Sequence, residues 1–262
     1  MISRKVILSL LIVFFITIPF ALHSQTQPVE NSKPVLVIVH GAWGGGWAFK
    51  KVDSILTQKG YAVYRPTLTG QGERVHLVSL DVGLSTHIED VINMILFEDL
   101  HDIILVGHSY GGMVITGVAD RLPDRIRRKV YLDAFVPEDG ESVMSIQGSR
   151  SEWITKMEKD GYLIPFWVKP DQAPPKDVPH PVKTFIDVIS LKNDAAKLIP
   201  TTYILTVEAG KKAEEDDFAS QAERAKKKGW TMMQMECDHN PQFNKPIELA
   251  DLFEQLLINE HR

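Results

Sequence analysis

Residues 103–113 read IILVGHSYGGM, and this stretch decides the fold. Its first four residues are apolar, as in a strand that is buried on both faces, and a helical pattern begins at Met113. Between them stands the pattern G-x-S-x-G, centred on Ser109. At a strand-to-helix turn, this pattern lifts the serine side chain above the sheet, and the flanking glycines let strand and helix approach closely. The stretch therefore predicts an α/β protein with Ser109 as an exposed nucleophile.

The rest of the chain alternates strand-like and helix-like segments, which is typical of a mainly parallel central sheet flanked by helices. We predict a capping box between Thr86 and Glu89 at the start of one helix. Residues 137–198 interrupt this alternation of strands and helices, because they are rich in proline and contain no clear strand. We expect them to form an inserted lid over the carboxyl edge of the sheet. Strands are predicted at 35–39, 62–64, 103–106, 129–132, 202–207 and 232–235, and helices at 47–59, 86–96, 113–121 and from 246 onward.

Length and composition exclude several classes of protein. The chain has 262 residues, of which 44% are hydrophobic and 24% charged, so it is not a disordered polyelectrolyte. Its single cysteine excludes an intrachain disulfide scaffold. The formal net charge of −5 argues against nucleic acid as a partner. The length suits one large domain.

The first residues have the order of a secretory signal peptide. Arg4 and Lys5 precede an apolar run over residues 6–18, and small and polar residues follow it. The run is shorter than the roughly 20 residues that a membrane-spanning helix needs, although an uncleaved anchor is the alternative. We predict a signal peptide at 1–24, a tether at 25–34 and one α/β domain at 35–262. The mature protein is expected to be secreted or periplasmic and free of the membrane.

A glycine-rich loop follows the first predicted strand. Residues 40–47 read HGAWGGGW. In this position a loop can offer a backbone N–H to a developing oxyanion, together with the N–H of the residue after the nucleophile. These donors would be Ala42 and Tyr110. His40 stands at a strand end before a tight turn, so we expect it to be a structural, hydrogen-bonded histidine.

Catalysis by a serine nucleophile also needs a base and an acid that orients the base. In the chain order serine, acid, histidine, only His239 lies after the last predicted strand and before the last helix. We expect His108 to point away from the nucleophile, because side chains alternate along a strand. The acid has two candidates at the ends of later strands, Asp133 and Glu208.

Taken together, these motifs make the chain similar to the α/β-hydrolase superfamily. It most resembles the bacterial esterase-like branch that is related to plant methyl-ester esterases and hydroxynitrile lyases. The resemblance implies Ser109 as nucleophile and His239 as base. Plant esterases carry their acid where Glu208 stands, as Asp, whereas other branches carry it where Asp133 stands, so the resemblance favours Asp133. Hydroxynitrile lyases have a lysine where this chain has Asn240, which argues against cyanide release.

The activity implied is hydrolysis of a small-molecule carboxylic ester, or a related acyl bond such as a lactone, through an acyl-enzyme. This chemistry requires no metal and no organic cofactor. The substrate pocket is expected to include Trp43, Phe135, Trp153 and Trp167, for which ordinary core packing is the alternative. A lyase or acyltransferase on the same triad, and a non-catalytic binding protein of this fold, are the alternative functions.

Overall fold

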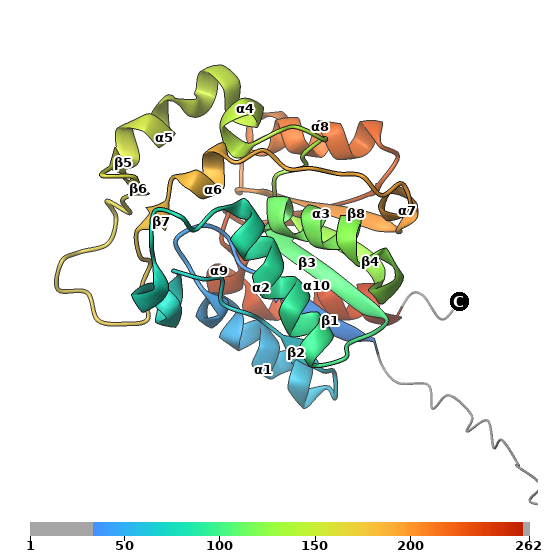
Figure 1. Cartoon of the computed structure of the whole chain (residues 1–262). Coiled ribbons are helices and arrows are strands. Elements are labelled where there is room, and N and C mark those ends of the chain that lie inside the picture. The colour runs from blue at the N-terminus through green and yellow to red at the C-terminus, as the bar shows by residue number, and fades with distance from the viewer. Residues whose placement is uncertain (1–33, 259–262) are drawn as a thin grey trace, which may run out of the picture. The chain divides into compact units, whose positions relative to one another are not determined.

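The computed structural model describes residues 34–258, and the predicted signal peptide lies outside this part of the chain. Its centre is a six-stranded sheet in the order β2-β1-β3-β4-β8-β9, with every neighbouring pair parallel (Figure 1). This confirms the α/β prediction. The strands are β1 (Val35–Val39), β2 (Val63–Tyr64), β3 (Ile103–His108), β4 (Ile126–Leu132), β8 (Thr201–Val207) and β9 (Thr231–Glu236).

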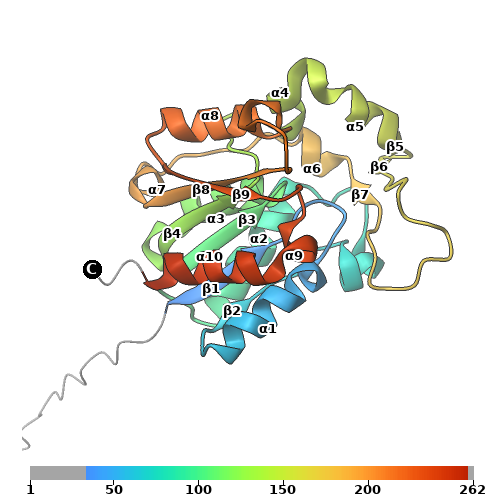
Figure 2. The ribbon, with the colours of Figure 1, turned by 180° about the vertical axis from the view of Figure 1, so that it is seen from behind.

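Helices cover both faces of this sheet, and alternating side chains divide the core into two clusters. Leu36 and Ile38 pack on one side, with α1 (Lys50–Gln58) and α10 (Pro246–Ile258), which lie across the near face in Figure 2. Val37 and Val39 pack on the other side. That second face is covered by α2 (Leu84–Phe97), α3 (Gly111–Arg121) and α8 (Ala219–Lys227). Strands that are covered by helices on both faces consist mainly of apolar residues, and such apolar runs are the easiest strands to predict from sequence.

The predicted capping box between Thr86 and Glu89 is wrong. α2 begins at Leu84, so Thr86 lies in its first turn, and its hydroxyl accepts a hydrogen bond from the N–H of Gly83. The carboxylate of Asp187, which is 103 residues away in sequence, accepts the N–H of Leu84. A partner so distant in sequence leaves no local signal for the true helix start.

The insertion between β4 and β8 is also more ordered than its sequence suggested. It contains a three-stranded antiparallel sheet, against the prediction of no strand, since strands of two residues are too short to show alternation. In Figure 1 this sheet and α5 lie beyond one end of the central sheet. The elements are α4 (Val143–Gln147), α5 (Glu152–Met157), β5 (Glu158–Lys159), β6 (Tyr162–Leu163), β7 (His180–Pro181), α6 (Lys183–Ile186) and α7 (Ala195–Leu198).

Short helical turns complete the fold. Among the described helices none is both long and apolar enough to cross a membrane. The remaining helix is α9 (Pro241–Asn244), and the 3-10 turns are η1 (Gly46–Phe49), η2 (Gly72–Leu77), η3 (Pro123–Arg125), η4 (Gly148–Ser151) and η5 (Ala213–Glu215).

Candidate active site

Ser109 occupies the sharp turn between β3 and α3. Its φ angle is 55°, a left-handed conformation that non-glycine residues rarely adopt. The backbone on both sides holds it there, because Ser109 N–H donates to Leu132 O (3.2 Å) and Ser109 O accepts the N–H of Phe135 (3.1 Å). A Cβ on Gly111 would lie 2.6 Å from Val39 O, so this turn needs glycine for the approach of α3 to β1. The strained turn is thus fixed by its neighbours in the sheet.

Asp133 and His239 meet beside this turn. The Nδ1 of His239 lies 2.6 Å from Oδ2 of Asp133, and the carboxylate is only 1% exposed. The other carboxylate oxygen accepts the N–H of Thr206 at 3.2 Å. Asp133 N–H in turn donates to Ile204 O at 2.8 Å, so β8 anchors both backbone and side chain. A carboxylate in this position favours the tautomer with the proton on Nδ1, which leaves Nε2 of His239 as a base.

The other candidate acid, Glu208, lies elsewhere. Its carboxylate is half exposed and pairs with Lys211 at 2.9 Å. In the described part of the chain, the carboxylate that contacts the His239 ring is that of Asp133. The structure therefore brings Asp133 and His239 together and leaves Glu208 as a solvated loop charge.

Two residues that the sequence did not reveal hold the ring and backbone of His239. Phe218, next to the start of α8, stacks on the imidazole with 4.8 Å between ring centroids and an interplanar angle of 6°. His108 donates from Nε2 to the backbone oxygen of His239 at 2.8 Å. Burial lowers the pKa of His108 to about 3, so it acts as a neutral donor. The loop after β9 thus reaches the end of β3, where the ring centroids of His108 and His239 are 4.7 Å apart. That His108 points away from Ser109 stays a prediction.

The glycine-rich loop lies against Ser109, since a Cβ on Gly41 would be 3.0 Å from Cβ of Ser109. His40 is buried, with its Nδ1 2.7 Å from Gly41 O and its Nε2 accepting the N–H of Leu68, which confirms the structural reading. Burial lowers its pKa to about 4. Within the described chain, the N–H groups of Ala42 and Tyr110 donate no hydrogen bond. Both are thus available to a ligand oxygen at the positive end of α3.

The side chain of Tyr110 is fixed below the site. Its hydroxyl lies 3.0 Å from Nδ1 of His87, whose Nε2 lies 2.9 Å from the carbonyl of Thr69. A carbonyl only accepts, so Nε2 of His87 carries the proton and Tyr110 donates to Nδ1. Burial lowers the pKa of His87 to about 4, which keeps this chain of hydrogen bonds neutral.

An aromatic pocket opens over Ser109 and His239, with a volume of about 550 Å³. All four predicted substrate residues line it, and a smaller hollow of about 370 Å³ adjoins it at Trp43 and Trp167. Trp43 is the centre of the aromatic wall, with ring centroids 5.2 Å from Trp167 and 6.3 Å from Trp153. The sequence did not reveal Phe185, which is 6.0 Å from Trp43. Across residues 34–258 no group of three His, Cys, Asp or Glu side chains could hold a metal ion.

Known proteins with similar sequences include named esterases. A carbendazim hydrolyzing esterase of Nocardioides sp. (strain SG-4G) is 57% identical over 110 residues, which are 42% of this chain and 46% of that protein. The chain spans about half the length of this and other curated relatives that it matches. Methylesterase 1 of Arabidopsis thaliana is 26% identical over 263 residues, covering 86% of this chain and 96% of that protein.

Solved structures and a family model agree with the fold. An extracellular alpha/beta-hydrolase from a Paenibacillus species superposes with a TM-score of 0.69 at 22% identity, over 85% of this chain and 98% of that one. The family model described as the alpha/beta hydrolase family matches residues 36–252, which contain the central sheet except Val35 and every residue of the site. The chain belongs to the alpha/beta hydrolase family.

Proposed function

We propose that the chain is a serine-dependent hydrolase of small carboxylic esters. One observation carries the proposal: the buried Asp133 carboxylate holds His239 at 2.6 Å in the same pocket as Ser109, which stands at a strained strand-to-helix turn. A nucleophile, a base and an acid that orients the base are the parts needed for acyl transfer. Relatives that are named esterases support the same class of reaction.

In the proposed mechanism, Nε2 of His239 takes the proton of the Ser109 hydroxyl while Oγ attacks the ester carbonyl. The N–H groups of Ala42 and Tyr110 donate to the oxyanion that develops, which in other enzymes lowers the barrier by about 2.7–4 kcal/mol per donor. Asp133 stabilises the imidazolium ion. His239 then gives its proton to the leaving alkoxide, and water releases the acid from Ser109 by the reverse steps.

The aromatic walls indicate the kind of ester. Trp43, Trp153 and Trp167 offer flat apolar surfaces to the pocket over Ser109, and Phe135 also lines it. Such surfaces bind ring-containing or branched apolar groups by area and by ring stacking. We therefore propose an apolar, ring-bearing ester as substrate, and residues 137–198 as the lid that carries Trp153 and Trp167.

We also propose that the protein is secreted or periplasmic after cleavage near residue 24. The order of basic, apolar and polar residues in 1–24 supports this location. N-terminal sequencing of the protein recovered from the culture medium or periplasm tests it. A protein that retains Arg4 and Lys5 and sediments with membranes would contradict the proposal.

Ser109→Ala tests the activity. With 4-nitrophenyl acetate as substrate, we expect a fall in kcat of roughly 10³-fold or more, without loss of thermal stability. Activity within tenfold of the parent would end the serine mechanism. Product analysis with an added alcohol, and separately with a cyanohydrin, distinguishes hydrolysis from acyl transfer and from lyase chemistry.

A further inference from the structure

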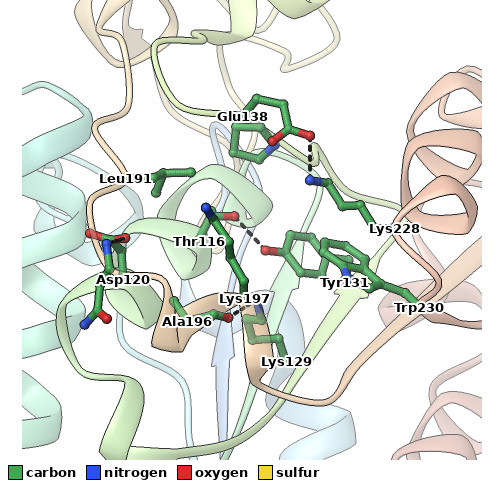
Figure 3. Close-up of a pocket in the computed structure, with 12 residues that line it drawn as sticks. Thr116, Asp120, Lys129, Tyr131, Glu138, Leu191, Ala196, Lys197, Lys228 and Trp230 are labelled. Atoms are coloured by element: carbon green, nitrogen blue, oxygen red, sulfur yellow. Dashed lines mark hydrogen bonds and ion pairs between the residues drawn. The ribbon is translucent and has the colours of Figure 1, made fainter.

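A second cavity, of about 270 Å³, shares no lining residue with the pocket over Ser109. Its walls come from α3, from β4 and from the segment that leads into β9. Both ends of the insertion also line it, through Glu138 and through the stretch from Leu191 to Lys197. Figure 3 shows Tyr131 and Trp230 on one side of the space and Leu191 and Asp120 on the other.

Lys129 is the unusual group in this cavity. The residue is only 5% exposed, and its Nζ makes one hydrogen bond, to Ala196 O at 3.0 Å (Figure 3). An ammonium group has three protons to donate, and a buried charge is unfavourable unless it is paired. No carboxylate of the described residues forms an ion pair with it. Burial, and secondarily the neighbouring Lys228, lower its pKa to about 8.

The other charges of the cavity already have partners. Lys228 pairs with Glu138 at 2.5 Å. Asp120 accepts two backbone N–H groups of the insertion at 2.8 and 2.9 Å. Lys197 pairs with Asp194 at 2.7 Å. Within residues 34–258, Lys129 is thus a buried positive charge without an ion-pair partner, whereas the negative charge of Asp120 is already satisfied by backbone N–H groups.

A flat apolar wall stands beside this charge. Trp230 stacks on Tyr131 with 4.9 Å between ring centroids and an interplanar angle of 26°. The Nζ of Lys129 lies 5.5 Å from the centroid of the Trp230 ring. The hydroxyl of Tyr131 is engaged by Thr116 at 2.6 Å, so Tyr131 offers ring surface rather than a free hydroxyl.

We propose that this cavity is a second binding site, for a small monocarboxylate with a flat apolar body. Its carboxylate binds the Lys129 ammonium, and its body lies against Trp230. One unmatched positive charge suits one negative charge, and the aromatic wall favours an organic anion over an inorganic one. The volume is close to the lower limit of ordinary ligand sites, about 300 Å³, which suits a ligand with a single ring. The proposal does not depend on the activity at Ser109.

Calorimetric titration of the whole protein with benzoate tests the site, with neutral benzamide as the matched probe. We expect benzoate to bind and benzamide to bind at least tenfold more weakly. Lys129→Met removes the charge but keeps the length of the side chain, and should weaken benzoate binding at least tenfold. Lys226→Met, on the exposed side of α8, should leave it unchanged. No binding of benzoate, or equal binding by both lysine variants, would overturn the proposal.

A crystal soaked in 4-bromobenzoate gives a second measurement that needs no variant. The anomalous signal of bromine should lie beside Trp230, with the carboxylate within hydrogen-bond distance of the Lys129 Nζ. Bromine only in the pocket over Ser109, or nowhere in the protein, would show that the cavity is not a carboxylate site.

Discussion

Replacing Asp133 by asparagine perturbs the proposed triad with little change in shape. The amide oxygen can still accept the N–H of Thr206, which the carboxylate accepts at 3.2 Å. The amide nitrogen, however, now faces Nδ1 of His239, where the carboxylate oxygen stood at 2.6 Å. Because an NH₂ group donates, the imidazole must turn to the tautomer with its proton on Nε2, and that nitrogen can no longer take a proton from Ser109.

The expected loss is large because, among the described residues, Asp133 supplies the carboxylate that contacts the His239 ring. Asp133 is 1% exposed, so water cannot substitute for it. In the serine-protease triad the same replacement lowers kcat about 10⁴-fold, which corresponds to about 5 kcal/mol of barrier, and we expect a similar loss here. The assay is the steady-state hydrolysis of 4-nitrophenyl acetate. Glu208→Gln is the matched control and should stay within about twofold of the parent, since its carboxylate is exposed and bound to Lys211.

Two results would refute this reasoning. One is an Asp133→Asn enzyme within tenfold of the parent, with an unchanged thermal midpoint. The other is a large loss in Glu208→Gln, which would move the acid to the position that plant esterases use.

Two further predictions concern stability. Gly111→Ala would bring a Cβ within 2.6 Å of Val39 O, so we expect a loss of about 1–3 kcal/mol, read as a lower thermal midpoint. Gly44→Ala, whose Cβ would have no neighbour closer than 3.9 Å, is the control, and equal midpoints would contradict the argument. For His87, burial lowers the pKa from 6.5 to about 4, so the unfolded chain takes up its proton first as the pH falls. Its contribution to stability is therefore complete above pH 6.5 and declines by about 3 kcal/mol by pH 4. The free energy of unfolding of the parent and of His87→Gln is measured by urea titration at pH 6.5 and at pH 4. The parent should lose about 3 kcal/mol more than the variant between these pH values. An equal loss in both proteins would exclude this role of His87.

The parts of the fold that could be predicted from sequence are those with dense local signals. β1 and the first four residues of β3 are continuous apolar runs, and the glycines around Ser109 mark a turn that few other residues permit. The start of α2 was misplaced because Asp187, which accepts its first N–H, comes from the insertion.

The residues of the candidate site likewise include some that local sequence predicts and some that depend on the packing of distant segments. Ser109 and His239 have positions that chain order constrains, and Ala42 and Tyr110 follow from them. The choice between Asp133 and Glu208 depends on which strand end faces the histidine loop, and this is a matter of sheet register rather than of local sequence. Phe218 stands in a charged stretch, so nothing near it indicates that it stacks on the imidazole.

The measurement that tests the central proposal most directly is covalent labelling of the parent protein. Incubation with diethyl 4-nitrophenyl phosphate, followed by mass spectrometry of the intact chain and of its peptides, identifies the residue that attacks. The mechanism predicts one diethylphosphoryl group per chain, on Ser109, with loss of esterase activity in proportion to labelling. Labelling of another residue, or full hydrolysis by a protein that carries the label on Ser109, would contradict the proposed role of this serine.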